Sequence, residues 1–201
     1  HGFFYAFSPH EFQPELIQIT KRFSSLFEQT YRRYLDLVKA EAQAREAQIE
    51  TALERIRSRA MSMQTSEELA DVAFVLFQQL RTLGGNLWGT GFGLCQKNSD
   101  LDSFWFANES GVFPPVSIPN TTDSAHKQMF EGWKSGKDFL AIEASGEDLK
   151  SHYDYLLSMP EVKPFFQKIL DEGLSFPNWQ QWNAAYFKQG YLLIITLEPY
   201  P

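Results

Sequence analysis

The best candidate for acid–base chemistry in this 201-residue sequence is the segment Glu147–Ser158, which carries the apolar spacing of a helix. Asp148, His152 and Asp154 lie close together in it, and a spacing of four on a helix places the Asp148 carboxylate beside the His152 imidazole. Such a pair can transfer a proton, but no nucleophile in a recognisable motif accompanies it. We therefore expect this chain to have no enzymatic activity of its own.

Other reactive motifs are missing from the sequence. There is no HExxH motif and no cysteine–histidine cluster at metal-ligand spacing, so we expect no metal site and no cofactor. The glycines of residues 84–93 lack the Lys-Ser/Thr pair and the following helix of a phosphate-binding loop. Cys95 is the only cysteine, which excludes a disulfide framework, and we interpret it as a buried structural thiol.

Composition and charge exclude further classes of function. Hydrophobic residues make up 43% of the chain and aromatic residues 15%, which is enough for a folded core. Residues 1–63 carry a net charge of about +1 and residues 64–201 about −8, so we expect the acidic part to repel nucleic acid. No apolar run is long enough to span a membrane, and no signal peptide begins the sequence. A cytoplasmic segment from the middle of a longer protein fits these features best.

The first third of the chain predicts one long helix over residues 9–64. Between Pro14 and Gly84 there is neither glycine nor proline, and the apolar residues recur at steps of three, four and seven. In the second half of this segment the apolar pattern narrows to positions separated by seven residues, with one apolar neighbour, as in a coiled-coil seam; these positions are Ala42, Ile49, Leu53, Ile56 and Met63.

A helix with one narrow apolar stripe needs a partner to be stable. We expect the seam to pair with the same helix of a second chain in a parallel homodimer. Two other arrangements are compatible with the pattern: the helix could fold back onto its own domain, or pair with a second chain in the antiparallel sense.

Residues 65–201 predict an α+β domain with an antiparallel sheet flanked by helices. Thr65 and Glu68 have the spacing of a capping box for the first helix of this domain. The predicted order is a helix at 66–83, a hairpin of strands at 86–96 and 101–108, an edge strand or loop at 111–119, a helix at 123–135, a strand at 137–143, helices at 147–158 and 160–172, and a final hairpin at 184–199.

This order of elements is similar to that of the GAF family of small sensory domains. The segment GFFYAFSPHEFQPELIQITKRF at the start of the chain resembles the last strand and exit helix of such a domain, and GYLLIITLEPYP at residues 190–201 partly repeats it. The resemblance therefore implies that residues 1–8 are the last strand of a preceding module. The motif AREAQIETALERIRSRAMSMQTSEELA also resembles linkers of bacterial multi-domain sensor histidine kinases and related signalling proteins.

The GAF resemblance implies a ligand pocket between the sheet and residues 112–155. On that basis the candidate lining residues are Trp105, Trp133, His152 and Tyr186; ordinary core packing is the alternative for each of them, and His152 could also cap a helix. A bilin chromophore is not expected, because Gln96 rather than histidine follows Cys95. The pattern of cyclic-nucleotide-binding relatives is also not evident.

The sequence thus leads to two functional hypotheses. In the first, the chain is a non-catalytic sensory and dimerisation module of a bacterial two-component or related signal-transduction protein. Its long helix would then relay the signal. In the second, binding of an unknown small molecule is the main function and dimerisation is incidental.

Overall fold

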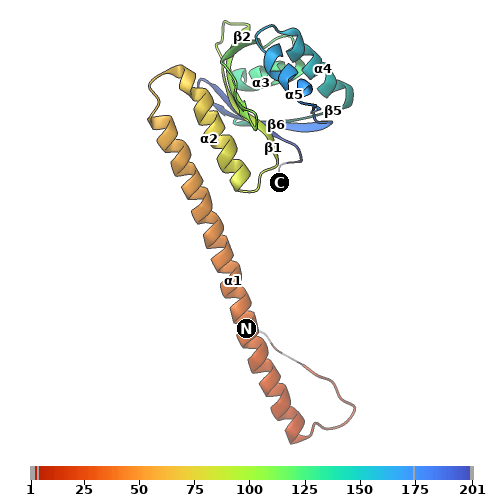
Figure 1. Ribbon diagram of the computed structural model, residues 1–201. Coiled ribbons are helices and arrows are strands. Elements are labelled where there is room, and N and C mark those ends of the chain that lie inside the picture. The colour runs from red at the N-terminus through yellow and green to blue at the C-terminus, as the bar shows by residue number, and fades with distance from the viewer. Residues whose placement is uncertain (1–2, 4, 174, 200–201) are drawn as a thin grey trace. The chain divides into compact units, whose positions relative to one another are not determined.

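The computed structural model describes residues 3, 5–173 and 175–199 of the chain (Figure 1). It divides into two compact units, residues 1–51 and residues 52–201. The fold is α+β, with a long N-terminal helix and an open antiparallel sheet flanked by helices, as the sequence predicts. Within the described part of the chain, no helix has the length and apolar character needed to cross a bilayer.

Helix α1 spans Pro14–Met61 and is continuous over 48 residues, so it provides most of the first unit and enters the second. Pro14 and Glu15 suit its first turn. The backbone N–H that proline lacks would have no acceptor within the helix at this position, and the negative charge of Glu15 interacts favourably with the positive end of the helix dipole. It is shorter at both ends than the predicted range 9–64. Residues 3 and 5–8 have no strand assignment, and residues 1, 2 and 4 lie outside the described residues. The expectation that residues 1–8 are the last strand of a preceding module therefore stays a prediction.

The N-terminal part of α1 carries large apolar side chains that are exposed on the single chain. Phe23 is 60% exposed, Leu26 59% and Phe27 70%. The same is true, to a smaller degree, of Leu16, Ile17, Ile19, Tyr31, Tyr34, Leu35, Leu37 and Val38. The residues of this helix are strong helix formers. However, most of the stability of a helix normally comes from burial of its apolar side chains, and on the single chain these side chains are not buried.

The second unit is built on one sheet of seven strands among the described residues, with the order β3-β2-β1-β7-β6-β5 and β4 also paired to β2. All pairings are antiparallel. The strands are β1 Leu87–Leu94, β2 Leu101–Asn108, β3 Gly111–Val112, β4 Val116–Pro119, β5 Phe139–Ser145, β6 Trp179–Phe187 and β7 Gly190–Thr196.

Both predicted hairpins are present, β1–β2 and β6–β7. The prediction for the second hairpin is wrong in one respect, since β6 begins at Trp179 and not at residue 184. Gln180 and Gln181 interrupt the apolar alternation there, but both are buried by the helices and neighbouring strands that cover this end of the sheet. The region 111–119 forms two short edge strands separated by Pro114 and Pro115, as expected for residues that cannot all donate to a ladder.

Helices cover both faces of the sheet (Figure 1). One face is covered by α2, Leu69–Thr82, which follows the short 3₁₀ helix η1, Ser66–Glu68. The Thr90 hydroxyl donates to the Ala73 carbonyl oxygen at 2.6 Å and joins β1 to α2. The other face carries α3 Ser124–Lys134, α4 Gly146–Ser158 and α5 Lys163–Asp171.

The predicted capping residues also connect the end of α1 to the start of α2 within the second unit. The Glu68 carboxylate accepts from the backbone N–H groups of Gln64 at 3.1 Å and Thr65 at 3.3 Å. The Arg59 guanidinium donates to Glu68 at 2.8 Å and to Asp71 at 2.6 Å. These bonds lower the pKa of Glu68 and fix the turn through which α1 enters the domain.

Glycines on β1 make space for the aromatic core on the α3–α5 face. Gly89, Gly91 and Gly93 alternate along the strand, and the rings of Phe104, Phe106 and Tyr191 occupy the volume in which their side chains would lie. A Cβ atom on Gly91 would lie 2.6 Å from the Trp105 carbonyl oxygen. The alternating glycines are therefore needed for packing and not for phosphate binding.

Candidate functional site

An apolar cavity of about 60 Å³ lies between the sheet and helices α3, α4 and α5. Its described lining is dominated by aromatic and aliphatic side chains, among them Trp88, Phe104, Phe106, Phe113, Met129, Phe166 and Leu193. Binding pockets for drug-sized ligands are usually about 300–1,000 Å³. In the conformation described here, the cavity fits a very small molecule or part of a larger one.

A few polar groups project into this apolar lining. Gln180 is fully buried, and its amide nitrogen donates to the Tyr153 hydroxyl at 2.7 Å. Its amide oxygen accepts from the Trp182 indole nitrogen at 3.2 Å. His126 and His152 complete the polar part of the wall. Because the nitrogen and the oxygen of the Gln180 amide are both already hydrogen-bonded, the two histidines are the polar groups best placed to contact a ligand.

A second, more polar groove of about 290 Å³ lies beside the cavity. Its lining comes from the start of α3, from α4 and from β5, and includes Thr122, Ser124, Gln128, Glu143, Asp148, Ser151 and Tyr155. His152, Trp182 and Ala125 border both the groove and the cavity. These residues therefore form the wall between a polar groove and an apolar cavity.

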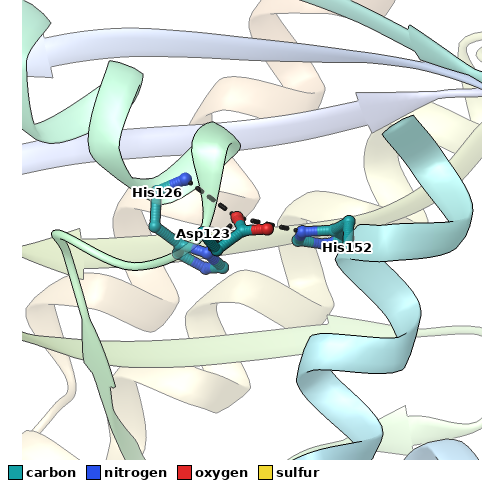
Figure 2. Close-up of side chains that lie close together, drawn as sticks. All are labelled: Asp123, His126 and His152. Carbon is teal, nitrogen blue, oxygen red and sulfur yellow. Dashed lines mark hydrogen bonds and ion pairs between the residues drawn. The ribbon is translucent and has the colours of Figure 1, made fainter. Parts of the chain in front are cut away.

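Asp123 is the centre of the polar interactions in this wall. It is the N-cap of α3, and its Oδ2 atom accepts the backbone N–H groups of Ala125 and His126, each at 3.1 Å. The same oxygen lies 2.8 Å from His126 Nδ1 and 3.1 Å from His152 Nδ1 (Figure 2). One carboxylate oxygen thus joins the first turn of α3 to a side chain in the middle of α4.

The electrostatics of this cluster favour an ionised carboxylate and a neutral His152. Burial by itself would raise the pKa of Asp123, but the hydrogen bonds from His126 and His152 outweigh it and hold that pKa well below its usual range. Burial lowers the pKa of His152, and the hydrogen bond to Asp123 opposes this only in part. The lowered pKa of Asp123 and the lowered pKa of His152 are compatible, because a neutral imidazole with its proton on Nδ1 still donates to the carboxylate.

Ring contacts fix the orientation of both imidazoles. The His126 and His152 rings stack with their centroids 5.5 Å apart and their planes 24° from parallel. The His152 ring centroid lies 4.8 Å from that of Trp182, and Phe104 meets His126 edge to face at 6.2 Å. His126 is 4% exposed and Asp123 8%, so the cluster is held in place by packing as well as by hydrogen bonds.

The four residues predicted for the pocket lie in three places. His152 lines the cavity and the groove. Trp105 is buried on the opposite face of β2 from Phe104 and Phe106, and so faces the side of the sheet that α2 covers. Trp133 and Tyr186 lie together in a separate surface groove, where their polar atoms bond to the carbonyl oxygens of Lys188 and Met129, respectively.

The seam residues are divided between the two units. Ala42 and Ile49 belong to the first unit, where Ala42 is exposed and Ile49 half-buried. Leu53, Ile56 and Met63 belong to the second, where Leu53 is 46% exposed and the other two are half-buried.

Sequence reasoning missed two members of the polar cluster, Asp123 and His126. It did not select His126, and it paired His152 with the carboxylate of Asp148, which lies one turn away on the same helix. Asp148 instead lines the polar groove, and the carboxylate bonded to His152 is that of Asp123. The available signal was the sequence Asp-Ser-Ala-His at 123–126, in which an N-cap aspartate precedes a histidine by three positions. That spacing does not reveal that residue 152 lies beside it.

The chemistry available in this wall is proton exchange, hydrogen bonding and coordination of a ligand by imidazole and carboxylate. The described lining of the cavity contains no serine, cysteine or lysine. Its one phenol, Tyr153, has a pKa raised by burial, so it remains protonated. Cys95 is buried outside the cavity lining, and burial raises the pKa of its thiol, which disfavours the reactive thiolate.

Comparison with protein-family models, with curated proteins and with solved structures finds no match to this chain. The function must therefore be inferred from its own residues.

Proposed function

We propose that this chain is a non-catalytic sensory and dimerisation module of a bacterial signal-transduction protein, and that α1 pairs in parallel with α1 of a second copy. The observation that carries the proposal is the row of large apolar side chains exposed along α1 between residues 16 and 38. Farther along the helix, the seven-residue spacing that begins at Ala42 and Ile49 adds a coiled-coil pattern to it.

The exposed row needs a partner for energetic reasons. Complete burial of one leucine or phenylalanine side chain is worth about 1.5–3 kcal/mol, and isolated helices are marginal in water even when their sequences favour helix. An exposed run of this length also exceeds the scattered apolar residues of an ordinary surface. A second copy of the same helix is the occupant that a repeated seven-residue pattern fits best.

The structure also supports a route by which α1 would pass on a signal. Because α1 continues without a break into residues 52–61, a rotation of the paired helices would turn its last residues. Arg59 there is bonded to Glu68 and Asp71, next to the helix that packs on β1 and β2. Paired helices have a small number of discrete packings, so a change at the domain would favour one packing over another.

A GAF-like sensory role for residues 65–201 is part of this proposal. Support comes from the order of elements, with a helix, a hairpin, middle helices and a final hairpin, and from a cavity between the sheet and the middle helices. The second candidate function is binding of a small molecule in that cavity, with dimerisation incidental. The size of about 60 Å³ favours a ligand far smaller than a nucleotide or a bilin.

The dimer is tested by light scattering on the chain and two matched variants. Ile49→Glu places a charge in the seam, whereas Gln48→Glu places the same charge on the adjacent exposed residue. We expect the wild type and Gln48→Glu to have the mass of a dimer and Ile49→Glu to shift strongly to monomer. A wild-type monomer at every concentration would overturn the proposal.

A further inference from the structure

Three side chains with metal-ligating atoms meet at the wall between the cavity and the groove. One ligand atom from each of Asp123, His126 and His152 lies within 4.8 Å of the other two, and the residues come from two different helices (Figure 2). Two of the three residues are buried and His152 is half-buried. Chance clusters of surface acids do not have this composition, with two imidazoles and one carboxylate held in a packed wall.

Two of the three separations between these ligand atoms are close to those of a metal coordination sphere. Asp123 Oδ2 lies 2.8 Å from one imidazole Nδ1 and 3.1 Å from the other. Ligand atoms bound to Zn²⁺ at about 2.0–2.1 Å in tetrahedral geometry lie about 3.3–3.4 Å from one another. These two separations would have to lengthen by a few tenths of an ångström for Asp123 to share an ion with each imidazole, and one ligand atom of each residue already lies within 4.8 Å of the other two.

We propose that Asp123, His126 and His152 form a binding site for a single transition-metal dication of the zinc type. Imidazole nitrogen suits Zn²⁺, Co²⁺ and Fe²⁺, whereas Ca²⁺ and Mg²⁺ require mostly oxygen ligands. Two histidines and one carboxylate leave at least one coordination position open, as in metal sites that also bind water or a small ligand.

The protons can be accommodated without charging either ring. In the metal-free cluster both Nδ1 atoms lie within hydrogen-bond distance of Asp123 Oδ2, and each ring donates to it when its proton is on Nδ1. On metal binding each imidazole can remain neutral by carrying its proton on Nε2, which frees Nδ1 as a ligand.

The surroundings would hold the carboxylate in place while the metal binds. The backbone N–H groups of Ala125 and His126 donate to Oδ2 and would remain there as outer hydrogen bonds of the site. The positive end of α3 opposes a cation at this position, but this effect is small compared with three metal–ligand bonds. The N-cap geometry therefore orients the carboxylate without preventing coordination.

The polar groove gives an ion access and supplies candidates for the remaining position. Asp123 and His152 border it, as do Glu143, Asp148 and Ser151. Water, or an anionic ligand that enters through the groove, could bind the open position of the metal. The metal site is independent of the proposed dimer, because every residue that forms it belongs to the second unit of one chain.

The test is titration of metal-free protein with Zn²⁺ by calorimetry, together with Co²⁺ absorption spectroscopy. We expect one ion per chain with a dissociation constant of about 1 μM or tighter, and visible Co²⁺ bands typical of low coordination number. Asp123→Asn keeps an N-cap acceptor but removes the charged ligand, and His152→Gln removes one imidazole. Both should weaken binding by about 100-fold or more, whereas His10→Gln, at an exposed histidine of the first unit, should not.

Two results would overturn the proposal. The first is no Zn²⁺ binding by the wild type, which would make the cluster a hydrogen-bonded clamp between α3 and α4. The second is binding that Asp123→Asn and His152→Gln leave unchanged while circular dichroism shows both variants folded, which would place the ion elsewhere. Light scattering on the same samples separates this outcome from any failure of the dimer.

Discussion

The two units of this chain are stabilised in different ways. Residues 52–201 enclose a core in which Leu149, Tyr191 and Ala184 are almost completely buried. In residues 1–51 the large side chains of α1 are exposed on the single chain, with Phe27 at 70%. The second unit therefore has a core of its own, whereas the exposed side chains of the first are the basis for the proposed pairing with a second copy.

Dilution should separate the two units most clearly. α1 holds 48 residues, about as many as α2, α3, α4 and α5 together, so its loss would remove a large share of the helical signal. All five tryptophans lie in the second unit. If pairing stabilises α1, lowering the concentration should reduce the circular dichroism at 222 nm by up to about half with no change in tryptophan fluorescence. Loss of both signals together would show that the units are not independent.

Removal of the Asp123 carboxylate should produce the largest change in the second unit. Asp123→Ala leaves two backbone donors and two imidazoles without their acceptor and removes the N-cap of α3. We expect the free energy of unfolding to fall by about 3 kcal/mol, measured by urea titration with tryptophan fluorescence. Asp123→Asn should lose less, and neither variant should alter the mass of the dimer. An Asp123→Ala protein as stable as the wild type would show that the cluster does not hold α3 to α4.

A methyl group on Gly91 should cause a smaller loss. Its Cβ atom would lie 2.6 Å from the Trp105 carbonyl oxygen and 3.1 Å from the Phe106 ring, so strands β1 and β2 would have to move apart. We expect Gly91→Ala to lower the free energy of unfolding by about 2 kcal/mol in the same urea experiment. Ala44→Ser, on an exposed position of α1, serves as the control and should not change the tryptophan transition.

Replacement of Asp102 should raise stability slightly, in a way that depends on pH. Burial raises the pKa of Asp102, although Asn120 donates to it at 2.9 Å. A raised folded pKa means that stability is lost as pH rises through it, because the carboxyl must then ionise in a buried position. Asp102→Asn should therefore match the wild type below about pH 4 and exceed it by about 1 kcal/mol at neutral pH. A stability difference in favour of Asp102→Asn that grew as the pH fell would contradict the raised pKa of Asp102.

The sequence predicted the elements of the second unit well because their signals are local. The capping pair Thr65 and Glu68 and the glycines near residue 84 mark the ends of α2, and the alternation at 101–108 matches β2. The bounds of several elements differ by two or three residues, and the largest difference is the start of β6, where Gln180 and Gln181 are buried by tertiary packing that local pattern does not report.

The site was much less predictable than the fold. His152 was identified, but its partners Asp123 and His126 are brought to it by the packing of α3 against α4 over a separation of more than 25 residues. Trp105, Trp133 and Tyr186 were selected as aromatic residues for the pocket that the GAF resemblance implies, but none of the three lines the cavity. The face of the sheet on which a strand residue lies depends on the register of the strand, and a shift of one residue moves its side chain to the opposite face.

The central claim, that α1 pairs in parallel with α1 of a second copy, is tested most directly by disulfide cross-linking in a Cys95→Ser background. Ala42→Cys places a thiol on the seam, and Ala44→Cys places one nearly opposite on the same helix, each replacing an exposed alanine. Under mild oxidation we expect Ala42→Cys to form a covalent dimer rapidly and Ala44→Cys to remain monomeric on a non-reducing gel. Equal cross-linking of the two variants, or none from Ala42→Cys, would contradict a parallel seam.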